Sequence, residues 1–420
     1  MANVTLDRRQ SSPPAASAPA QEKPAKTNPY YASLAGKFKV AKYITLVLFI
    51  AFLLSSFTLK RSEITLENLQ YLMKFISFTN TETSITATKI NYSASDDTHL
   101  ALFNGDLCYL SPIGYSLYDA RGNTIDSEPI KYSSPEIEVS DGFVLCYDLG
   151  GNSFTILNTF SRLYSETLDY PITAACIADN GSFAVGTNSR EYRTAVCLYD
   201  NNFKLISRVY KDKYLTGLAM KKDASEVAVM TTGAKSGEYY SEISLIVPGA
   251  EQESHSTSIP ALGYQIRYHE NGISVLSDEG IWFFDKSLNL KKQISYPASL
   301  TMVNAGSRYL ACAYQSGIIE NDATVCVYGE DGTQFFGAKL DGKLTAISIS
   351  PDGNDVFVLS GSTVYRLDMA ERKLGKATVE SGSSGIIAQS HDSFLLVMPN
   401  YALTCADTSF EEVTFAQISK

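Results

Sequence analysis

The sequence predicts an all-β fold, in which the main domain is a β-propeller of eight four-stranded blades, with seven blades as the alternative. Two observations predict it. The composition favours strands over helices, because 45% of the 420 residues are apolar, only 19% are charged, and Tyr and Phe number 26 and 20. In addition, a segment of about 41 residues recurs eight times between about residue 92 and the C-terminus, which is the spacing of propeller blades.

The repeat is clearest at residues 344–368, LTAISISPDGNDVFVLSGSTVYRLD, where two turns, SPDG and SG, separate three strands. The third strand and the turn after it recur in phase, ending at Asp119, Asn158, Asp200, Pro248, Asp285, Gly329, Asp368 and Asp407. One four-stranded sheet cannot bury both of its faces alone, whereas blades stacked around an axis cover one another. A β-sandwich is the alternative fold, but it does not explain eight copies in phase.

The propeller is expected to occupy residues 85–420. Two short segments, at 85–90 and 413–418, have the composition of strands and lie at the two ends of this domain. Either of them could supply an outer strand that closes the ring of blades.

The apolar segment at residues 43–59, YITLVLFIAFLLSSFTL, carries no charge and predicts one transmembrane helix of about 25 Å. A cleaved signal peptide is the alternative, but the segment before the apolar run is too long and no small-residue cleavage site follows. Residues 1–42, rich in Ala, Pro and Ser, predict a disordered tail. Residues 60–84 predict an amphipathic stalk helix and a linker.

The distribution of charge predicts the orientation. Residues 1–42 carry seven Lys and Arg against Asp7 and Glu22, so their net charge is +5, whereas the whole chain carries −10. The N-terminus is therefore expected in the cytoplasm and the C-terminal domain outside a single-pass cytoplasmic membrane protein. Because that domain is acidic, nucleic acid is excluded as a partner.

The SPDG turn at Ser350–Gly353 and the VYRLD strand end resemble the WD40-like and quinoprotein-like propeller superfamilies. The whole layout is similar to uncharacterised single-pass, membrane-anchored β-propeller proteins of Gram-positive bacteria. The resemblance implies the fold and the placement at the membrane. The Gly-His and Trp-Asp pairs of WD40 repeats are missing, and Trp282 is the only tryptophan. A tryptophan ring like that of quinone-binding relatives is therefore not expected.

The sequence predicts no catalytic, cofactor-binding or metal-binding residue. Four histidines are spread over different repeats without an H-x-x-x-H pair, so zinc ligation is not indicated by spacing. Seven cysteines are expected mainly as buried thiols. The alternative is at least one disulfide, for which Cys312 and Cys326 are candidates because they could face each other across a hairpin.

Three connections between second and third strands are unusually long, at 187–194, 231–242 and 314–323, and these connections emerge on one face of a propeller. They carry the residues predicted to form a ligand face: Arg190, Tyr192, Arg193, Lys235, Tyr239, Tyr240 and Tyr314. Tyrosine and arginine are typical of binding surfaces. The sequence therefore predicts a binding or scaffold module for a protein, peptide or cell-wall glycan. The alternative is a hydrolase or lactonase with its site in the central channel, which would need carboxylates or histidines from several blades.

Overall fold

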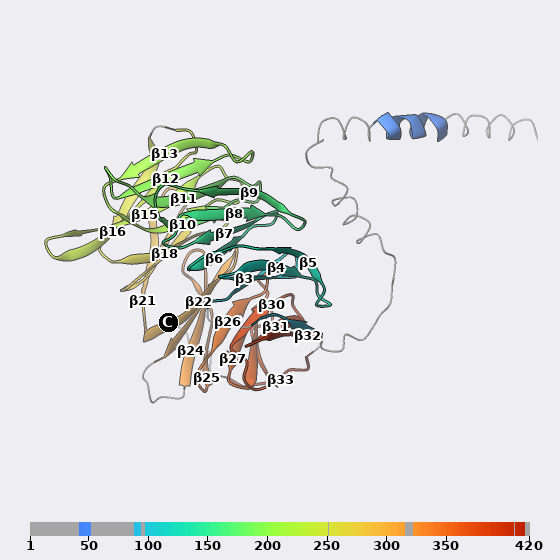
Figure 1. Cartoon of the computed structure of the whole chain (residues 1–420). Helices are drawn as coiled ribbons and strands as arrows, with labels where there is room; N and C mark the ends of the chain where they lie inside the picture. Colours follow the sequence, from blue (N-terminus) through green and yellow to red (C-terminus); the bar gives the residue numbers. More distant parts are fainter. Residues whose placement is uncertain are drawn as a thin grey trace, which may run out of the picture. The chain divides into compact units, whose positions relative to one another are not determined.

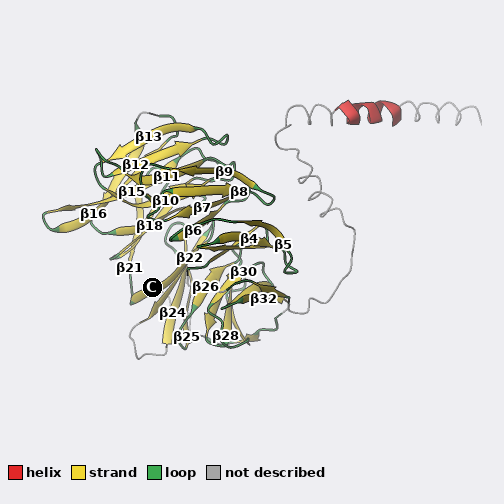
Figure 2. Cartoon of the chain, in the orientation of Figure 1, coloured by secondary structure: helices red, strands yellow, loops and turns green. Residues whose placement is uncertain are grey.

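Antiparallel sheets succeed one another along almost all of the C-terminal part of the chain (Figure 1 and Figure 2). The computed structural model describes residues 42–51, 88–93, 97–250, 252–315, 322–406 and 408–415. The strands in these residues form eight sheets, and within most sheets the strand order follows the chain order. This is the predicted propeller of eight four-stranded blades, and the alternative of seven blades is excluded.

The first four blades follow the order of the chain. Blade 1 contains β2 (His99–Phe103), β3 (Asp106–Ser111), β4 (Gly114–Tyr118) and β5 (Thr124–Glu128). Blade 2 contains β6 (Pro135–Val139), β7 (Val144–Asp148), β8 (Ser153–Leu157) and β9 (Arg162–Thr167). Blade 3 contains β10 (Ile172–Ile177), β11 (Phe183–Asn188), β12 (Thr194–Tyr199) and β13 (Leu205–Lys211). Blade 4 contains β14 (Tyr214–Met220), β15 (Val227–Lys235), β16 (Glu238–Ile246) and β17 (Glu253–Ile259).

The last four blades include the two ends of the domain. Blade 5 contains β18 (Gly263–Tyr268), β19 (Ile273–Ser277), β20 (Gly280–Phe284) and β21 (Leu290–Ser295). Blade 6 contains β22 (Ser299–Ala305), β23 (Tyr309–Gln315), β24 (Asp322–Gly329) and β25 (Gln334–Asp341). Blade 7 contains β26 (Ala346–Ile349), β27 (Asp355–Ser360), β28 (Thr363–Asp368), β29 (Lys373–Thr378) and β33 (Glu411–Glu412). Blade 8 contains β30 (Gly385–Ala388), β31 (Ser393–Met398), β32 (Tyr401–Ala406) and β1 (Lys89–Asn91).

The ring is closed by the N-terminal strand. β1 pairs with β32, with Ile90 opposite Ala402, and so supplies the outer strand of blade 8. The C-terminal segment 413–418 was the other candidate for a closing strand, and its described residues, 413–415, form no strand. β33 pairs with β29 and adds a fifth strand to blade 7, with the backbone N–H of Val413 bonded to the carbonyl of Leu374. Residues 416–418 of the expected strand lie outside the described residues.

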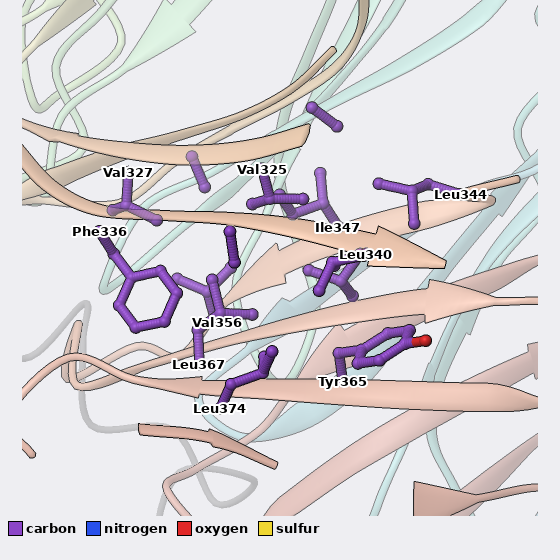
Figure 3. Close-up of a cluster of buried hydrophobic side chains, with 14 of the residues drawn as sticks. Val325, Val327, Phe336, Leu340, Leu344, Ile347, Val356, Tyr365, Leu367 and Leu374 are labelled. Atoms are coloured by element: carbon purple, nitrogen blue, oxygen red, sulfur yellow. The ribbon is translucent and has the colours of Figure 1, made fainter. Parts of the chain in front are cut away.

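The hydrophobic core is divided among the contacts between neighbouring blades. Figure 3 shows one of these clusters, in which Val325 and Phe336 of blade 6 pack against Val356 and Leu367 of blade 7. A corresponding cluster lies between each of the other neighbouring pairs, including one in which Ile90 joins blade 8 to blade 1. Because middle strands are covered on both faces, β7 and β20 are buried at every residue.

The aspartate that recurs after the third strand has a local structural role. The Asp200 carboxylate accepts hydrogen bonds from the backbone N–H groups of Asn202 and Lys204, at 2.9 and 2.8 Å. Asp119 and Asp285 accept the corresponding pairs of bonds in blades 1 and 5. The side chain thereby satisfies backbone donors in the turn from third to fourth strand.

The chain divides into two compact units, Met1–Asn80 and Thr81–Lys420, and the eight sheets belong to the second. In the first unit, residues 42–51 form a helix. Within the described residues, no helix combines the length and the apolar character that a membrane crossing requires. The remainder of the expected tail, transmembrane helix and stalk, namely 1–41, 52–59 and 60–84, lies outside the described residues.

Candidate ligand-binding face

Blades 3 and 4 carry most of the residues that the sequence predicted for ligand binding. Arg190, Tyr192 and Arg193 lie in the connection between β11 and β12. Tyr239 and Tyr240 lie on β16, which forms a long hairpin with β15. In both blades these residues are on the side where second strands lead into third strands.

Three adjoining hollows connect these residues into one surface. The first, of about 620 Å³, is lined by Arg193, Tyr214, Tyr239 and Tyr240 among others. The second, of about 560 Å³, shares Arg193 and Tyr214 with the first. The third, of about 610 Å³, shares Arg190 and Tyr192 with the second. We call this surface the ligand face and define it by Arg190, Tyr192, Arg193, Tyr210, Tyr214, Tyr239 and Tyr240.

Stacking between side chains orders the part of the face where blade 3 meets the start of blade 4. The rings of Tyr192 and Tyr210 stack with centroids 5.0 Å apart and planes inclined by 28°. The Arg193 guanidinium lies 4.6 Å from the centroid of the Tyr214 ring and donates a hydrogen bond to its hydroxyl. The tyrosines nevertheless keep much of their area in water, with Tyr192 47%, Tyr214 58% and Tyr239 60% exposed. Exposed aromatic area of this kind is available to a ligand.

Ion pairs neutralise the lysines at the base of the blade 4 hairpin. Lys213 contacts the Glu242 carboxylate at 2.6 Å, and this hydrogen bond raises the pKa of the lysine. Lys211 contacts the Ser244 hydroxyl at 2.8 Å and pairs with Glu253. These groups are therefore engaged within the protein rather than available to a ligand.

The two arginines of the face, and Lys235 at the end of the neighbouring hairpin, differ from those lysines. Within the described part of the chain, Arg190, Arg193 and Lys235 have no carboxylate within ion-pair distance. Exposed tyrosines thus lie beside arginines that form no ion pair among the described residues, although carboxylates such as Asp212 and Glu191 line the same hollows. This arrangement suits a ligand that has both an anionic group and a flat or apolar surface.

The structure also departs from the predicted site in detail. Tyr314 is not on the surface: it lies in the contact between blades 5 and 6, is only 1% exposed, and donates a hydrogen bond to the Tyr328 hydroxyl at 3.3 Å. Lys235 stands at the end of the hairpin, outside the three hollows. The long connection at 231–242 is mostly strand, with a turn at Ser236 and Gly237 only.

Two tyrosines of the face were missed in the sequence. Tyr210 lies on β13, and Tyr214 begins β14, directly after the short connection between blades 3 and 4. Connections between blades emerge on the same side as those between second and third strands, because the strands of a blade alternate in direction. The charged run KDKY at 211–214 between two predicted strands was the signal that could have found Tyr214.

The central channel forms a separate hollow of about 710 Å³, lined by residues from all eight blades. Glu138 of blade 2 forms an ion pair with Arg267 of blade 5 at 3.7 Å, and the Glu136 carboxylate lies 3.7 Å from Nδ1 of His99 in blade 1. Burial raises the pKa of Glu138, with Arg267 acting in the opposite direction. No three His, Cys, Asp or Glu side chains gather as a possible metal site within the described residues.

Replacement of Glu138 by glutamine tests how far the ionised carboxylate in the channel lowers the free energy of unfolding. Because its pKa is raised in the folded protein, protonated Glu138 contributes stability that is fully present below the unfolded pKa and is lost as the pH rises through the folded pKa. Glutamine resembles the protonated form, so Glu138→Gln is expected to be more stable than wild type at pH 7. The difference should disappear below about pH 4, near the pKa of an unperturbed glutamate.

Urea unfolding between pH 4 and pH 8 measures this difference, with Glu270→Gln as an exposed control. The Arg267 side chain is 42% exposed, so water solvates its charge when the Glu138 carboxylate is removed, and the loss of the ion pair costs little. A Glu138→Gln protein that is less stable than wild type at pH 7 would show that the ion pair outweighs the burial.

None of the seven cysteines is in a disulfide. Cys312 and Cys326 lie directly opposite each other on β23 and β24, as the hairpin pattern suggested, and both are buried. Burial raises the pKa of Cys312 to about 12 and that of Cys405 to about 11. The thiols of Cys312 and Cys405 are therefore protonated and weakly reactive at neutral pH.

Comparisons with known proteins agree with the fold. BamB from Moraxella catarrhalis matches with a TM-score of 0.50 and 12% identity over 76% of this chain and 100% of that chain. The C-terminal WD40 domain of Sif2 matches with a TM-score of 0.53 and 12% identity over 77% of this chain and 97% of that chain. At such low identity the likeness shows the fold alone. The comparison with curated proteins found no match. A family model described as a family of unknown function, DUF5711, matches residues 77–404, and the chain therefore belongs to that family.

Proposed function

We propose that this protein is a binding module that engages a partner protein through the ligand face of blades 3 and 4. The observation that carries the proposal is the gathering of exposed tyrosines, and of arginines without an ion pair among the described residues, around three adjoining hollows. Tyrosine and arginine are enriched where proteins bind one another, because they bring large contact area at a low cost in conformational entropy. The propeller supports them on rigid strands, which limits the ordering required on binding.

The same proposal places the propeller outside the cytoplasmic membrane, anchored by residues 43–59. The uncharged apolar segment, the net charge of +5 before it and the acidic domain after it support this placement. A partner would then be another protein on the outer side of the membrane.

Photo-crosslinking in intact host cells tests both parts. The full-length protein carries benzoylphenylalanine in place of Tyr239, and in a matched control in place of Leu290, which is 52% exposed and lies on β21 of blade 5. One defined protein adduct is expected at position 239 and none at 290. Protease added to the intact cells is expected to digest the adduct. An adduct that resists protease would contradict the placement, and equal crosslinking at both positions would contradict the ligand face.

The purified partner then allows a quantitative prediction. Arg193→Ala and Tyr239→Ala are each expected to weaken binding about tenfold or more, as truncation of tyrosine and arginine anchors commonly does. Leu290→Ala should leave the affinity unchanged. Calorimetry measures the three variants, and unchanged affinity in all of them would place the interface elsewhere on the propeller.

A further inference from the structure

The β15–β16 hairpin is longer than β14, the strand that pairs with β15 on its inner side. β14 pairs with β15 only as far as Thr232, opposite Tyr214. The next residues of β15, Gly233 to Lys235, continue opposite Tyr240 to Glu238 of β16 alone. Over these residues the described structure places no strand on the inner edge of β15.

The turn of this hairpin identifies the backbone groups that face the open edge. Ser236 and Gly237 have φ angles of 56° and 88°, which defines a two-residue turn of the type that joins twisted strands. Lys235 and Glu238 on either side of such a turn exchange backbone hydrogen bonds, and the pairing alternates along the strands. The N–H and C=O of Ala234 therefore point away from β16, toward the open edge.

The first hollow of the ligand face lies along this edge. Its lining includes both Gly233 and Ala234, which are consecutive on β15 and face opposite sides of the sheet, so the hollow follows the edge of the strand. Asp212, Lys213 and Tyr214 at the start of β14 complete the lining on that side. The hollow thus occupies the course that β14 would follow if it were longer.

The walls of the hollow define the chemistry of an occupant. Tyr214, Tyr239 and Tyr240 provide aromatic surface. Arg193 provides a guanidinium that has no carboxylate within ion-pair distance among the described residues. Lys213, in contrast, is paired with Glu242 at 2.6 Å and with Asp212, the carboxylate in the lining, at 3.9 Å. An extended peptide with an acidic side chain matches this combination of a free strand edge, aromatic walls and one arginine that forms no ion pair among the described residues.

We propose that an extended, acidic segment of the partner protein adds to β15 as an antiparallel strand, in line with β14, and hydrogen-bonds to the backbone of Ala234. This inference rests on the proposed function, because it names how the ligand face holds its partner. Backbone pairing supplies affinity, and the contact of an Asp or Glu side chain with Arg193 supplies specificity.

One pair of substitutions isolates the backbone hydrogen bond. Ala234→Pro removes the outward N–H without removing a hydrogen bond of the hairpin, because proline is tolerated on an open edge. Ala234→Val adds a side chain of similar volume and keeps the N–H. Ala234 is exposed, so neither substitution disturbs the core. Equal thermal unfolding midpoints of the two variants confirm that both fold.

The probe is a phage-displayed library of random dodecapeptides, selected on the immobilised full-length protein. The selected peptides are expected to share an Asp or Glu, and a synthetic copy is titrated by calorimetry. Ala234→Pro is expected to weaken its binding about tenfold relative to Ala234→Val. Arg193→Ala is expected to remove the preference for the acidic residue and the dependence of binding on salt.

Three outcomes would overturn the inference: a library without acidic binders, a peptide bound equally by the proline and valine variants, or a peptide indifferent to Arg193→Ala. The proposed function is judged separately. If the partner crosslinks at position 239 and Tyr239→Ala weakens its binding while Ala234→Pro does not, the ligand face stands and strand addition is wrong. A glycan adduct at position 239 would contradict both.

Discussion

Replacement of Arg366 by alanine is expected to lower the free energy of unfolding by about 3–5 kcal/mol, because it leaves a buried carboxylate without its main partner. The Asp355 side chain is fully buried where β27 begins, and the Nε of Arg366 on β28 donates a hydrogen bond to its Oδ1 at 2.8 Å. His391, which precedes β31 of blade 8, contacts the other carboxylate oxygen. The cluster thus links blade 7 to blade 8, the blade that closes the ring.

The effect of Arg366→Ala should depend on pH. Burial raises the pKa of Asp355, against the opposing effects of Arg366 and His391. Without Arg366 the pKa of Asp355 is expected to rise further. Acid then protonates this carboxylate in the variant and removes the unpaired buried charge. The loss of stability is therefore expected to be larger at pH 7 than at pH 5.

Urea unfolding followed by circular dichroism measures this loss. Lys373→Ala is the control, because its ion pair with Glu371 at 2.7 Å lies on the surface and its removal should change little. Adding Asp355→Asn to Arg366→Ala is expected to restore part of the stability at pH 7, since it removes the buried charge. If Arg366→Ala alone is as stable as the Lys373→Ala control, the buried pair of Asp355 and Arg366 adds no net stability.

The fold was predictable because the residues that recur in each repeat make their contacts with residues close to them in the chain. The aspartate at the end of the third strand accepts hydrogen bonds from backbone groups within four residues, as at Asp200. Every blade that uses this turn therefore has an aspartate at the same position of the repeat. Continuous apolar strands such as β20 follow from burial by two neighbouring blades. The role of β33 was not predictable, because it depends on contacts between residues far apart in the chain, such as Gly375 opposite Glu412.

The ligand face was predictable only in part for the same reason. Loop length pointed to Arg190, Tyr192 and Arg193, which lie in a true connection between strands. It failed for Tyr314, where β23 continues to Gln315 and directs the tyrosine into the contact between blades. Tyr214 belongs to another sequence segment, and only the packing of blade 3 beside blade 4 brings it to Arg193.

The second large effect is expected in the aromatic cluster around Phe183, at the end of the β11–β12 hairpin opposite the loop of the ligand face. Phe183 on β11 is fully buried, and its ring stacks on that of Tyr199 with centroids 4.3 Å apart and planes inclined by 8°. It also lies 5.4 Å from the ring of Phe154 in blade 2, so it joins blades 2 and 3. Phe183→Ala is expected to cost about 3–5 kcal/mol of unfolding free energy, through lost burial and the cavity left behind.

Chemical unfolding of Phe183→Ala, Phe183→Leu and Leu205→Ala separates the cavity from the loss of aromatic character. Leucine fills most of the space, so Phe183→Leu is expected to lose about 1.5 kcal/mol or less. Leu205 is 43% exposed, and its replacement should change stability by about 0.5 kcal/mol at most. Equal losses for alanine and leucine would assign the effect to ring stacking instead of volume. Because β11 leads directly into the loop that carries Arg193, weaker partner binding by folded Phe183→Ala would show that this cluster also positions the ligand face.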